Sequence, residues 1–264
     1  AGQIAAWIQR KNVPSEVPDT LARTNAMIRR HDALEADMNA IQDRVDLLTD
    51  QVPKLTEELP ESRDEIERTM DSIKVEWEAL KSKQSAHRDA LTERQKFLDF
   101  MSKAKAHENW LANMTNQLEK LKISDDLAII EAQILQHSEH QKIIAEKKED
   151  CDKIIAIGEN VTDSKDQVEE KSKELKNKTI ALDALWALVQ KDLEEAAKLA
   201  RFQRDCRRFE NWMEIRENAL SSDDEDQNIQ ILAKKNDDFH RGIKQQEAKI
   251  QSIVENSDKL AEEG

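Results

Sequence analysis

The chain has 264 residues, of which 36% are charged and 4% are aromatic, with 4 Gly, 4 Pro and no Tyr. Strands favour β-branched and aromatic residues and tight turns favour Gly and Pro, so this composition argues against an enzyme on a β or α/β scaffold. The formal net charge of −14 excludes a nucleic-acid-binding surface, because phosphates require a basic one. The abundant Ala, Leu, Glu, Lys, Gln and Arg instead favour helices.

Disorder and membrane insertion are the other classes that this composition raises. High charge with low hydrophobicity is typical of disordered chains, but here the apolar residues are periodic. No apolar run approaches the roughly 18 residues of a membrane span, and the first residues do not resemble a signal peptide. Cys151 and Cys206 lie far apart in apolar stripes, so we interpret them as buried thiols in a reducing compartment.

The first predicted helix contains Trp7 in the sequence AAWIQRK, and a break with two prolines follows it at residues 13–19. The second predicted helix follows this break, carries His31 and ends at a break that covers residues 52–62. It carries apolar residues at heptad spacing, which is typical of a helix that packs against others: Leu34, Met38, Val45 and Leu48.

The same order of elements then recurs. A predicted helix without Gly or Pro runs from Glu65 to about Ile123 and carries Trp77 and Trp110. After a break at residues 123–126, a helix repeats the pattern of the His31 segment with His137, His140, Ile144, Cys151 and Ile154. The next break covers residues 158–166.

A second long helix is predicted from Ser164 to Leu220, again without Gly or Pro. At 1.5 Å per residue it would span roughly 85 Å, which is longer than a globular domain allows. Residues along one face of this helix step by three and four: Leu175, Thr179, Leu182, Trp186, Val189, Leu193, Ala196 and Ala200. The next step, from Ala200 to Phe202, is only two residues, which predicts a junction between two bundles at this point. A break at residues 221–226 precedes a last helix.

Three of the breaks end in the S-x-x-E/Q pattern of a capping box, in which a hydroxyl accepts from a backbone amide of the first turn. We expect helices to start at these three pairs: Ser62 with Glu65, Ser164 with Gln167, and Ser222 with Glu225.

Trp7, Trp110 and Trp212 lie 103 and 102 residues apart, and they mark a tandem repeat. The second helices align on His31, His137 and Asn236, which are 106 and 99 residues apart. We therefore predict an all-α fold of tandem three-helix antiparallel bundles, joined by continuous helices into an elongated rod. The expected repeats cover residues 1–96 (first helix truncated), 97–198 (complete) and 199–264 (first two helices).

This pattern resembles the spectrin repeat, a three-helix unit of this length with a Trp in the first helix and a His-containing position in the second. The sequence looks like α- or β-spectrin, although plakin, dystrophin-like, α-actinin and nuclear-envelope rods share the unit. The resemblance covers the whole chain and implies these structural core residues: Trp7, Trp110, Trp212, Trp77, Trp186, His31 and His137.

Two positions depart from the family pattern. Asn236 stands in the third copy where the other two copies have His31 and His137. Trp77 precedes Trp110 by 33 residues, whereas Trp186 precedes Trp212 by 26. The difference is one heptad, so both third-helix tryptophans can face a core, in different layers.

We predict no catalytic, cofactor or metal site. His137 and His140 could share a metal, but no third ligand has suitable spacing, and a solvated or core-edge pair is the simpler interpretation. Cys151, beside two aspartates, fits a small buried hydrophobe better than a redox site. The acidic residues 221–226 lack the spacing and the Gly of a calcium-binding EF-hand. Common phosphate-binding, hydrolase and metalloprotease motifs are missing from the sequence.

The predicted function is a structural rod segment, a flexible and extensible spacer and scaffold in an actin-linked membrane skeleton at the cytoplasmic cell cortex. The resemblance implies lateral antiparallel pairing with other rod chains, and contact with actin through domains outside this segment. One alternative is a repeat that docks an ankyrin-type adaptor or a sister spectrin chain. A helix from a partner could complete the third bundle, which lacks its third helix, but we favour the interpretation that the segment simply ends there. The other alternative is a parallel two-chain coiled coil, which the breaks in the heptads disfavour.

Overall fold

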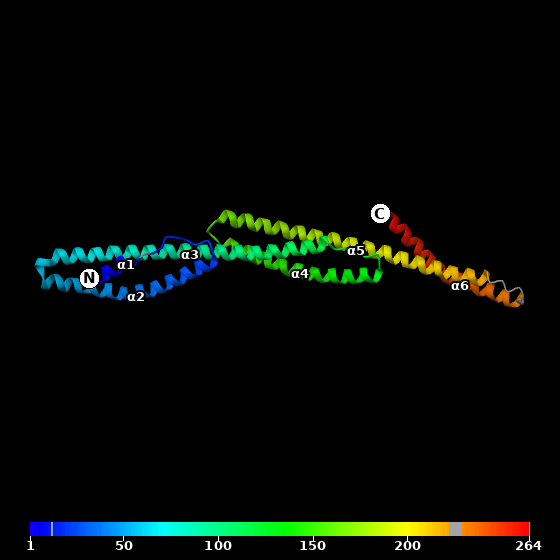
Figure 1. Cartoon of the computed structure of the whole chain (residues 1–264), viewed down its shortest axis with the longest axis horizontal. Helices are drawn as coiled ribbons and strands as arrows, with labels where there is room; N and C mark the ends of the chain where they lie inside the picture. Colours follow the sequence, from blue (N-terminus) through cyan, green and yellow to red (C-terminus); the bar gives the residue numbers. More distant parts are fainter. Residues whose placement is uncertain (12, 222–228, 264) are drawn as a thin grey trace. The chain divides into compact units, whose positions relative to one another are not determined.

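The computed structural model describes residues 1–11, 13–221 and 229–263 (Figure 1). The predicted all-α class is confirmed, and no strand occurs in these ranges. The elements are α1 (Gly2–Arg10), α2 (Leu21–Glu58), the short 3₁₀ turn η1 (Pro60–Ser62), α3 (Arg63–Glu119), α4 (Leu127–Glu159), α5 (Lys165–Ser221) and α6 (Ile229–Glu263).

The two long helices have the predicted extent, since α3 and α5 are each 57 residues long. The break predicted at residues 52–62 is too long, because α2 continues to Glu58 with Pro53 inside it. Proline removes one backbone donor from a helix, and here the helix ends within two turns of it. The turn η1 then leads directly into α3.

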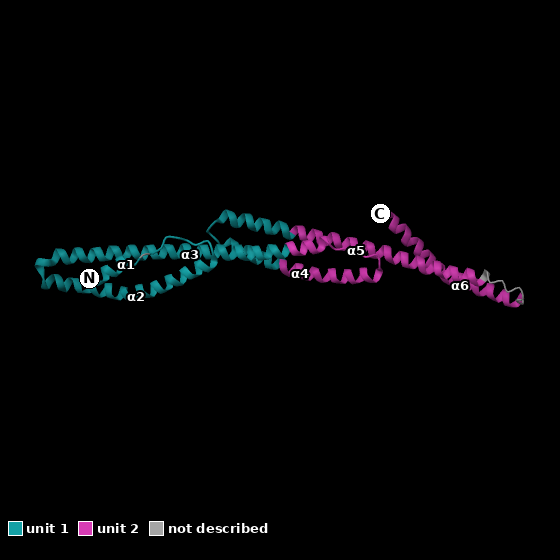
Figure 2. Ribbon diagram, in the orientation of Figure 1, with its two compact units in different colours: residues 1–111, 148–179 teal, residues 112–147, 180–264 magenta. Residues whose placement is uncertain are grey.

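The chain forms two compact units, residues 1–111 with 148–179 and residues 112–147 with 180–264 (Figure 2). In the first unit α1, α2 and the first part of α3 lie alongside one another and share a core. The side chains at its centre are buried and apolar: Ile4, Ile8, Met38, Val45, Met70, Ile73, Trp77 and Leu80. In α3 these residues are three or four positions apart, and in α2 Met38 and Val45 are one heptad apart, so each set lies on one face of its helix.

The first unit also contains the later part of α3, the end of α4 and the start of α5. Phe100 and Leu175 are fully buried here, and Cys151 is 2% exposed. Gly158, near the end of α4, packs so closely that an added Cβ would lie 2.8 Å from Cε2 of Phe100 and 2.9 Å from Cγ1 of Val168. Glycine is therefore required at this position by close approach of the neighbouring side chains.

The second unit contains the end of α3, the first part of α4, most of α5, and α6. Ile130 of α4 and Leu182 and Leu193 of α5 are almost fully buried. Beyond Ala200 the pattern changes, because Phe202, Phe209 and Trp212 of α5 are only half-buried and α6 has no fully buried residue among those described. The α5–α6 pair thus forms a hairpin with a partly open apolar face.

The helix starts predicted at Ser62 and Ser164 are confirmed, since α3 begins at Arg63 and α5 at Lys165. The capping-box hydrogen bonds predicted there are wrong at both positions. Ser164 has a positive φ of 53°, and its hydroxyl donates to Oδ1 of Asp163 at 2.9 Å instead of accepting from the first turn of α5. Ser62 belongs to η1, and no capping hydrogen bond from it occurs in the described part of the chain. The third box, at Ser222 and Glu225, lies outside the described residues.

A helix cap that the prediction missed occurs at the start of α4. Oδ1 of Asp126 accepts from the backbone N–H of Ala128 at 2.8 Å and of Ile129 at 3.3 Å. An aspartate at this position satisfies two amides that have no partner within the helix. The sequence ISDD therefore marks a helix start as well as a break.

None of the described helices is both long and apolar enough to cross a lipid bilayer.

Candidate functional site

The features that can serve a structural role in this chain are the contacts that hold its helices together. Trp77 of α3 is 2% exposed, and its ring lies 6.1 Å from that of Trp7 of α1. Nε1 of Trp77 donates to Oε1 of Gln42 in α2 at 2.6 Å. One side chain thus contacts both other helices, while Trp7 is half-buried beside the same core.

A second contact in this unit is a chain of two histidines. Nε2 of His87 in α3 donates to the backbone oxygen of Glu16 at 2.9 Å, because a carbonyl can only accept. Nδ1 of His87 then accepts from Nε2 of His31 in α2 at 2.8 Å. The pair ties both helices to the connection between α1 and α2, and the prediction identified only His31.

His31 is 3% exposed, and it is held in its neutral form. Burial is the main cause that lowers its pKa, and the neighbouring His87 and Arg88 lower it further. Arg88 forms an ion pair with Asp32, which favours the charged imidazole but does not outweigh burial. Protonation of His31 would therefore oppose folding of this region.

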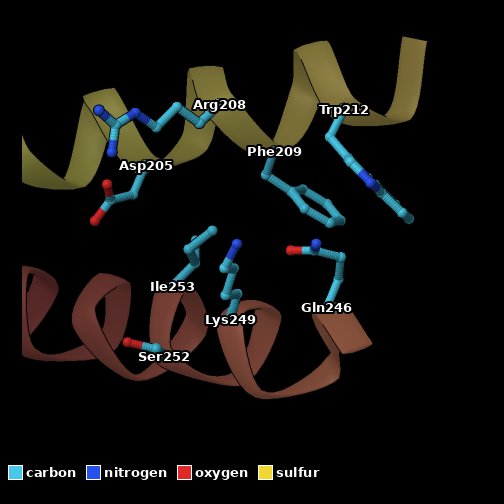
Figure 3. A pocket seen from close by; sticks show the side chains of 8 residues that line it. All are labelled: Asp205, Arg208, Phe209, Trp212, Gln246, Lys249, Ser252 and Ile253. Carbon is cyan, nitrogen blue, oxygen red and sulfur yellow. The ribbon is translucent and has the colours of Figure 1, made fainter. Parts of the chain in front are cut away.

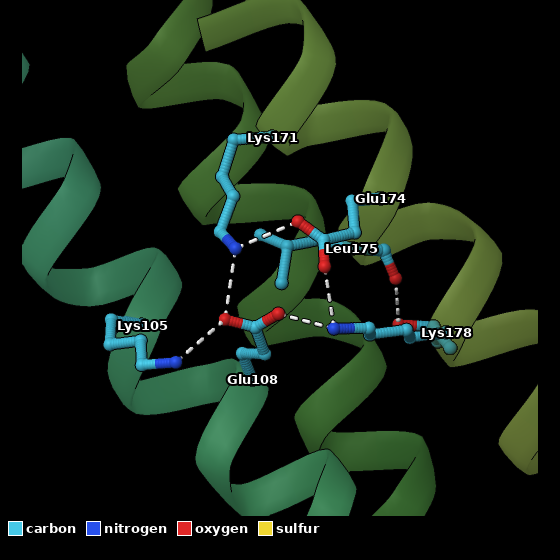
Figure 4. A network of polar contacts seen from close by, with 7 residues as sticks. Lys105, Glu108, Lys171, Glu174, Leu175 and Lys178 are labelled. Carbon is cyan, nitrogen blue, oxygen red and sulfur yellow. Dashed lines mark hydrogen bonds and ion pairs between the residues drawn. The ribbon is translucent and has the colours of Figure 1, made fainter. Parts of the chain in front are cut away.

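The most enclosed charge in the described chain is Glu108 of α3, whose side chain is 10% exposed (Figure 4). Its carboxylate binds Nζ of Lys178 and, at 2.9 Å, Nζ of Lys171, both from α5. Lys105 of α3 approaches to 3.3 Å, and Glu174 bridges the two α5 lysines from the other side. Hydrogen bonds from Lys178 and then Lys171 hold the pKa of Glu108 far below its usual range.

Polar contacts also attach the connection between α4 and α5 to α3. Oε2 of Glu93 accepts from the hydroxyl of Thr162 at 2.5 Å and from its backbone N–H at 3.2 Å. Arg94 pairs with Asp163 at 3.2 Å. The hydrogen bond from Lys96, followed by that from Thr162, lowers the pKa of Glu93 to about 2. This connection is therefore fixed on one side of α3.

In the second unit, His137 of α4 and Trp186 of α5 hold each other by two reciprocal bonds. Nε2 of His137 donates to the backbone oxygen of Trp186 at 3.0 Å, and Nε1 of Trp186 donates to the backbone oxygen of His137 at 3.1 Å. The rings are stacked, with centroids 4.8 Å apart and planes 2° from parallel. His137 is 2% exposed and Trp186 is half-buried.

Trp110 and Trp212, the other two tryptophans that mark the repeat, are both half-buried. The ring of Trp110 lies 5.9 Å from that of His107. Trp212 stacks on Phe209 at 5.9 Å and lines a cavity of about 300 Å³ between α5 and α6. Figure 3 shows Phe209 projecting from α5 toward α6, where Gln246 and Lys249 line the opposite side.

The two cysteines are free thiols in different surroundings. Cys151 is free and buried, as predicted, whereas Cys206 is free but only half-buried, so the prediction was wrong there. Thr179 donates to Sγ of Cys151 at 3.6 Å, which places this thiol in the core. Among the described residues, no group of three or more His, Cys, Asp or Glu side chains could hold a metal ion.

The seven predicted core residues differ in how deeply they are buried. Trp77, His31 and His137 are buried, while Trp7, Trp110, Trp186 and Trp212 are half-buried. The prediction missed His87 and Glu108, which form the polar contacts between helices. Glu108 lies two residues before Trp110 on a helix rich in carboxylates, so no signal in one sequence separates it from the others.

The comparisons with known proteins agree with this architecture. The spectrin-repeat family matches residues 1–93, 95–199 and 197–264. The spectrin alpha chain, erythrocytic 1, of Mus musculus is 29% identical over 180 residues, which is 66% of this chain and 8% of that protein. The chain thus spans a small part of the relative's length.

The three matched segments together cover nearly all of the sequence, and each contains one of the tryptophans that mark the period. The helical contacts described above are those expected when such segments pack as bundles of helices. The chain belongs to the spectrin-repeat family.

Proposed function

We propose that this chain is a structural, cytoskeletal rod segment that acts as a flexible and extensible spacer. The observation that carries the proposal is that α3 and α5 each continue for 57 residues and contribute to two successive sets of packed helices. A helix shared in this way couples neighbouring repeats, while each repeat keeps a core of its own. Each repeat, with boundaries near residues 96 and 198, would then unfold separately when the chain is stretched.

Single-molecule stretching of the chain between its two ends tests this proposal. We expect discrete unfolding events, each releasing about one repeat of roughly 100 residues, or about 35 nm at 3.3–3.6 Å per residue. Refolding on relaxation should restore the events, because a spacer must recover its length. Smooth extension without discrete events would contradict an array of separately folding repeats.

The proposed location is the cytoplasmic face of the cell cortex, within an actin-linked membrane skeleton. Family membership and the spectrin relative support a cytoskeletal role. Actin would be reached through domains outside this segment, and lateral antiparallel pairing with another rod chain would set the position of the rod.

A second candidate function is docking of a sister spectrin chain or an ankyrin-type adaptor. The partly open face of the α5–α6 hairpin favours it, because Ile243, Ile250 and Val254 of α6 are exposed. These three residues are seven and four positions apart, and exposed apolar residues at such steps on one helix are typical of a face that packs against a further helix.

A pull-down with a spectrin-type rod chain tests this second candidate. Ile243→Ser together with Ile250→Ser should weaken capture at least tenfold, whereas the neighbouring polar change Lys244→Ser should leave it unchanged. Equal capture by the two variants would show that α6 does not form the docking surface.

A further inference from the structure

The connection between α1 and α2 is attached to both α2 and α3 in the first unit. Pro18 is almost fully buried, and its backbone oxygen accepts from the hydroxyl of Thr24 at 3.4 Å. Arg23 of α2 pairs with the exposed carboxylate of Glu16 at 3.4 Å. His87 of α3 donates from Nε2 to the backbone oxygen of Glu16 at 2.9 Å. Of these contacts, only the bond from His87 depends on a buried group that titrates near neutral pH.

His87 forms this bond as one member of a pair of buried imidazoles. Nε2 of His31 donates to Nδ1 of His87 at 2.8 Å, and the ring centroids are 4.8 Å apart. The two neutral rings have four nitrogens, and the two hydrogen bonds occupy three of them. The fourth, Nδ1 of His31, is buried and has no hydrogen-bond partner in the described ranges of the chain. It carries a lone pair, because Nε2 holds the one hydrogen of the neutral ring.

An added proton brings a hydrogen to this fourth nitrogen, whichever ring carries the charge. If His31 is charged, both of its nitrogens hold hydrogens. If His87 is charged, its Nδ1 becomes a donor, so Nε2 of His31 must accept and the hydrogen of that ring moves to Nδ1. In either case the buried Nδ1 of His31 becomes a donor without an acceptor, which is unfavourable. The attached connection is therefore incompatible with a proton on the pair.

The charged groups around the pair come from the connection and from both helices. They are Glu16 of the connection, Arg23, Asp32 and Glu35 of α2, and Arg88 of α3. Arg88 pairs with Asp32 and lies 3.7 Å from Glu35, while Arg23 pairs with Glu16, so these carboxylates are already partnered. Burial, followed by His87 and Arg88, lowers the pKa of His31, and Asp32 opposes this only in part.

We propose that His31 and His87 act as a pH-sensitive switch, which holds residues 13–20 against α2 and α3 at neutral pH and releases them under mildly acidic conditions while the helices stay folded. Release admits water to the two rings, and the added hydrogen then has an acceptor. The apolar contacts of α1, such as Trp7 beside Trp77, involve no titrating group and remain.

The expected size of the effect follows from proton linkage. The attached state excludes the proton, whereas an imidazole in the released state binds it with the ordinary pKa of about 6.5. One such proton shifts the ratio of released to attached chains about tenfold between about pH 7.5 and about pH 5.5. The attached state is lost as the pH falls, because it binds the proton less readily than the released state.

Cleavage of the whole chain by a glutamate-specific endoprotease measures the release directly. The peptide bond after Glu16 contains the carbonyl that accepts from His87, so this carbonyl must leave His87 before the enzyme can attack it. The fragment of residues 1–16 is followed by mass spectrometry. A free peptide with the sequence of residues 11–21 corrects for the pH dependence of the enzyme itself. We expect the corrected rate to rise about tenfold from pH 7.5 to pH 5.5.

His31→Gln should reduce this rise to less than twofold. The glutamine amide donates to Nδ1 of neutral His87 and, after rotation, accepts from protonated His87, so the connection stays attached at both pH values. If this variant does not fold, His31→Asn gives the same test, since Asn236 stands at this position in the third copy of the repeat. His240→Ala removes an exposed histidine of α6 and should leave the tenfold rise unchanged.

A corrected rate that does not change with pH in the original chain would overturn the proposal. An equal rise in the original chain and in the folded glutamine or asparagine variant would also overturn it, because the pair would then not control the release. Circular dichroism at the same pH values should show an unchanged helix signal. Loss of that signal in parallel with cleavage would mean that the unit unfolds as a whole, which contradicts a local switch.

Discussion

At the scale of single residues, the two glycines of α4 and α6 meet different surroundings. The Cβ of an alanine at position 158 would lie 2.8 Å from the Phe100 ring, whereas one at position 242 would lie 3.6 Å from the Trp212 ring. The first distance forces neighbouring side chains to move, and the second is an ordinary van der Waals contact.

Gly158→Ala should therefore lower the free energy of unfolding by about 1–3 kcal/mol through overpacking. Gly242→Ala is the matched control, and it should raise this free energy by about 0.5–1 kcal/mol because alanine favours a helix. Urea unfolding followed by circular dichroism measures both. Equal effects of the two substitutions would mean that Gly158 is not closely packed.

The ion pairs of Glu108 lead to a second prediction, about how the free energy of unfolding depends on pH. They favour the ionised form, so the folded chain holds the pKa of Glu108 below its ordinary 4.5 and binds this proton less readily than the unfolded chain. The stabilisation is therefore complete above about pH 4.5 and is lost as the pH falls below it. Acid titration of the unfolding free energy should show this loss.

Glu108→Gln should lower the free energy of unfolding at neutral pH by about 1–2 kcal/mol, since Lys178 is partly exposed and water screens its pair. The substitution should also make the free energy of unfolding less dependent on pH below about pH 4.5. The matched control is Glu119→Gln, at an exposed position of the same helix. An unchanged acid profile in Glu108→Gln would show that these ion pairs do not stabilise the fold.

The buried histidines should affect the free energy of unfolding in a separate and higher pH range. Burial lowers the pKa of His31 and of His137 below the ordinary 6.5, so the unfolded chain takes up protons first as the pH falls. The free energy of unfolding should therefore decrease as the pH drops below about 6.5, before the carboxylates respond. His31→Gln should remove part of this step, and an unchanged step would contradict the role of burial.

Residue-scale prediction from sequence succeeded where the helix period decides burial and failed where a partner decides it. The predicted stripe of α5 is accurate, since Leu175, Leu182 and Leu193 are almost fully buried. Glu108 and His87 could not be selected, because their roles depend on side chains from other helices. A single sequence gives the face of a helix but not the identity of its neighbour.

At the scale of helices and their ends, composition predicted the extent of α3 and α5, which contain neither Gly nor Pro. The capping signals were less informative, because a serine before a helix can bind several partners. Ser164 donates to Asp163 instead of accepting from α5, and its positive φ turns the chain before the helix starts. Tertiary contacts of this connection, such as Thr162 with Glu93, explain the difference.

The cap at Asp126 gives a prediction at this scale. Asp126→Ala removes the acceptor of two amides at the start of α4 and should lower the free energy of unfolding by about 1 kcal/mol. Asp125→Ala, at the exposed preceding residue, is the matched control and should change it by less than about 0.5 kcal/mol. Thermal unfolding of the two variants checks this, and identical midpoints would rule out the cap.

At the scale of the whole molecule, the repeat could be predicted because the tryptophan interval is nearly constant while the connections vary. The all-α class and the continuous helices follow from that interval and from the lack of breaks. The residue boundaries of the repeats, at 96 and 198, stay a prediction, because a helix that serves two sets of neighbours has no end there.

Hydrogen exchange of backbone amides tests the central claim, that α3 and α5 pass from one repeat to the next without interruption. We predict that amides at residues 94–104 and 196–206 exchange as slowly as those one or two turns away in the same helices. They should exchange far more slowly than the amides of the connection at residues 120–126. Exchange at 94–104 or 196–206 as fast as in that connection would contradict the account.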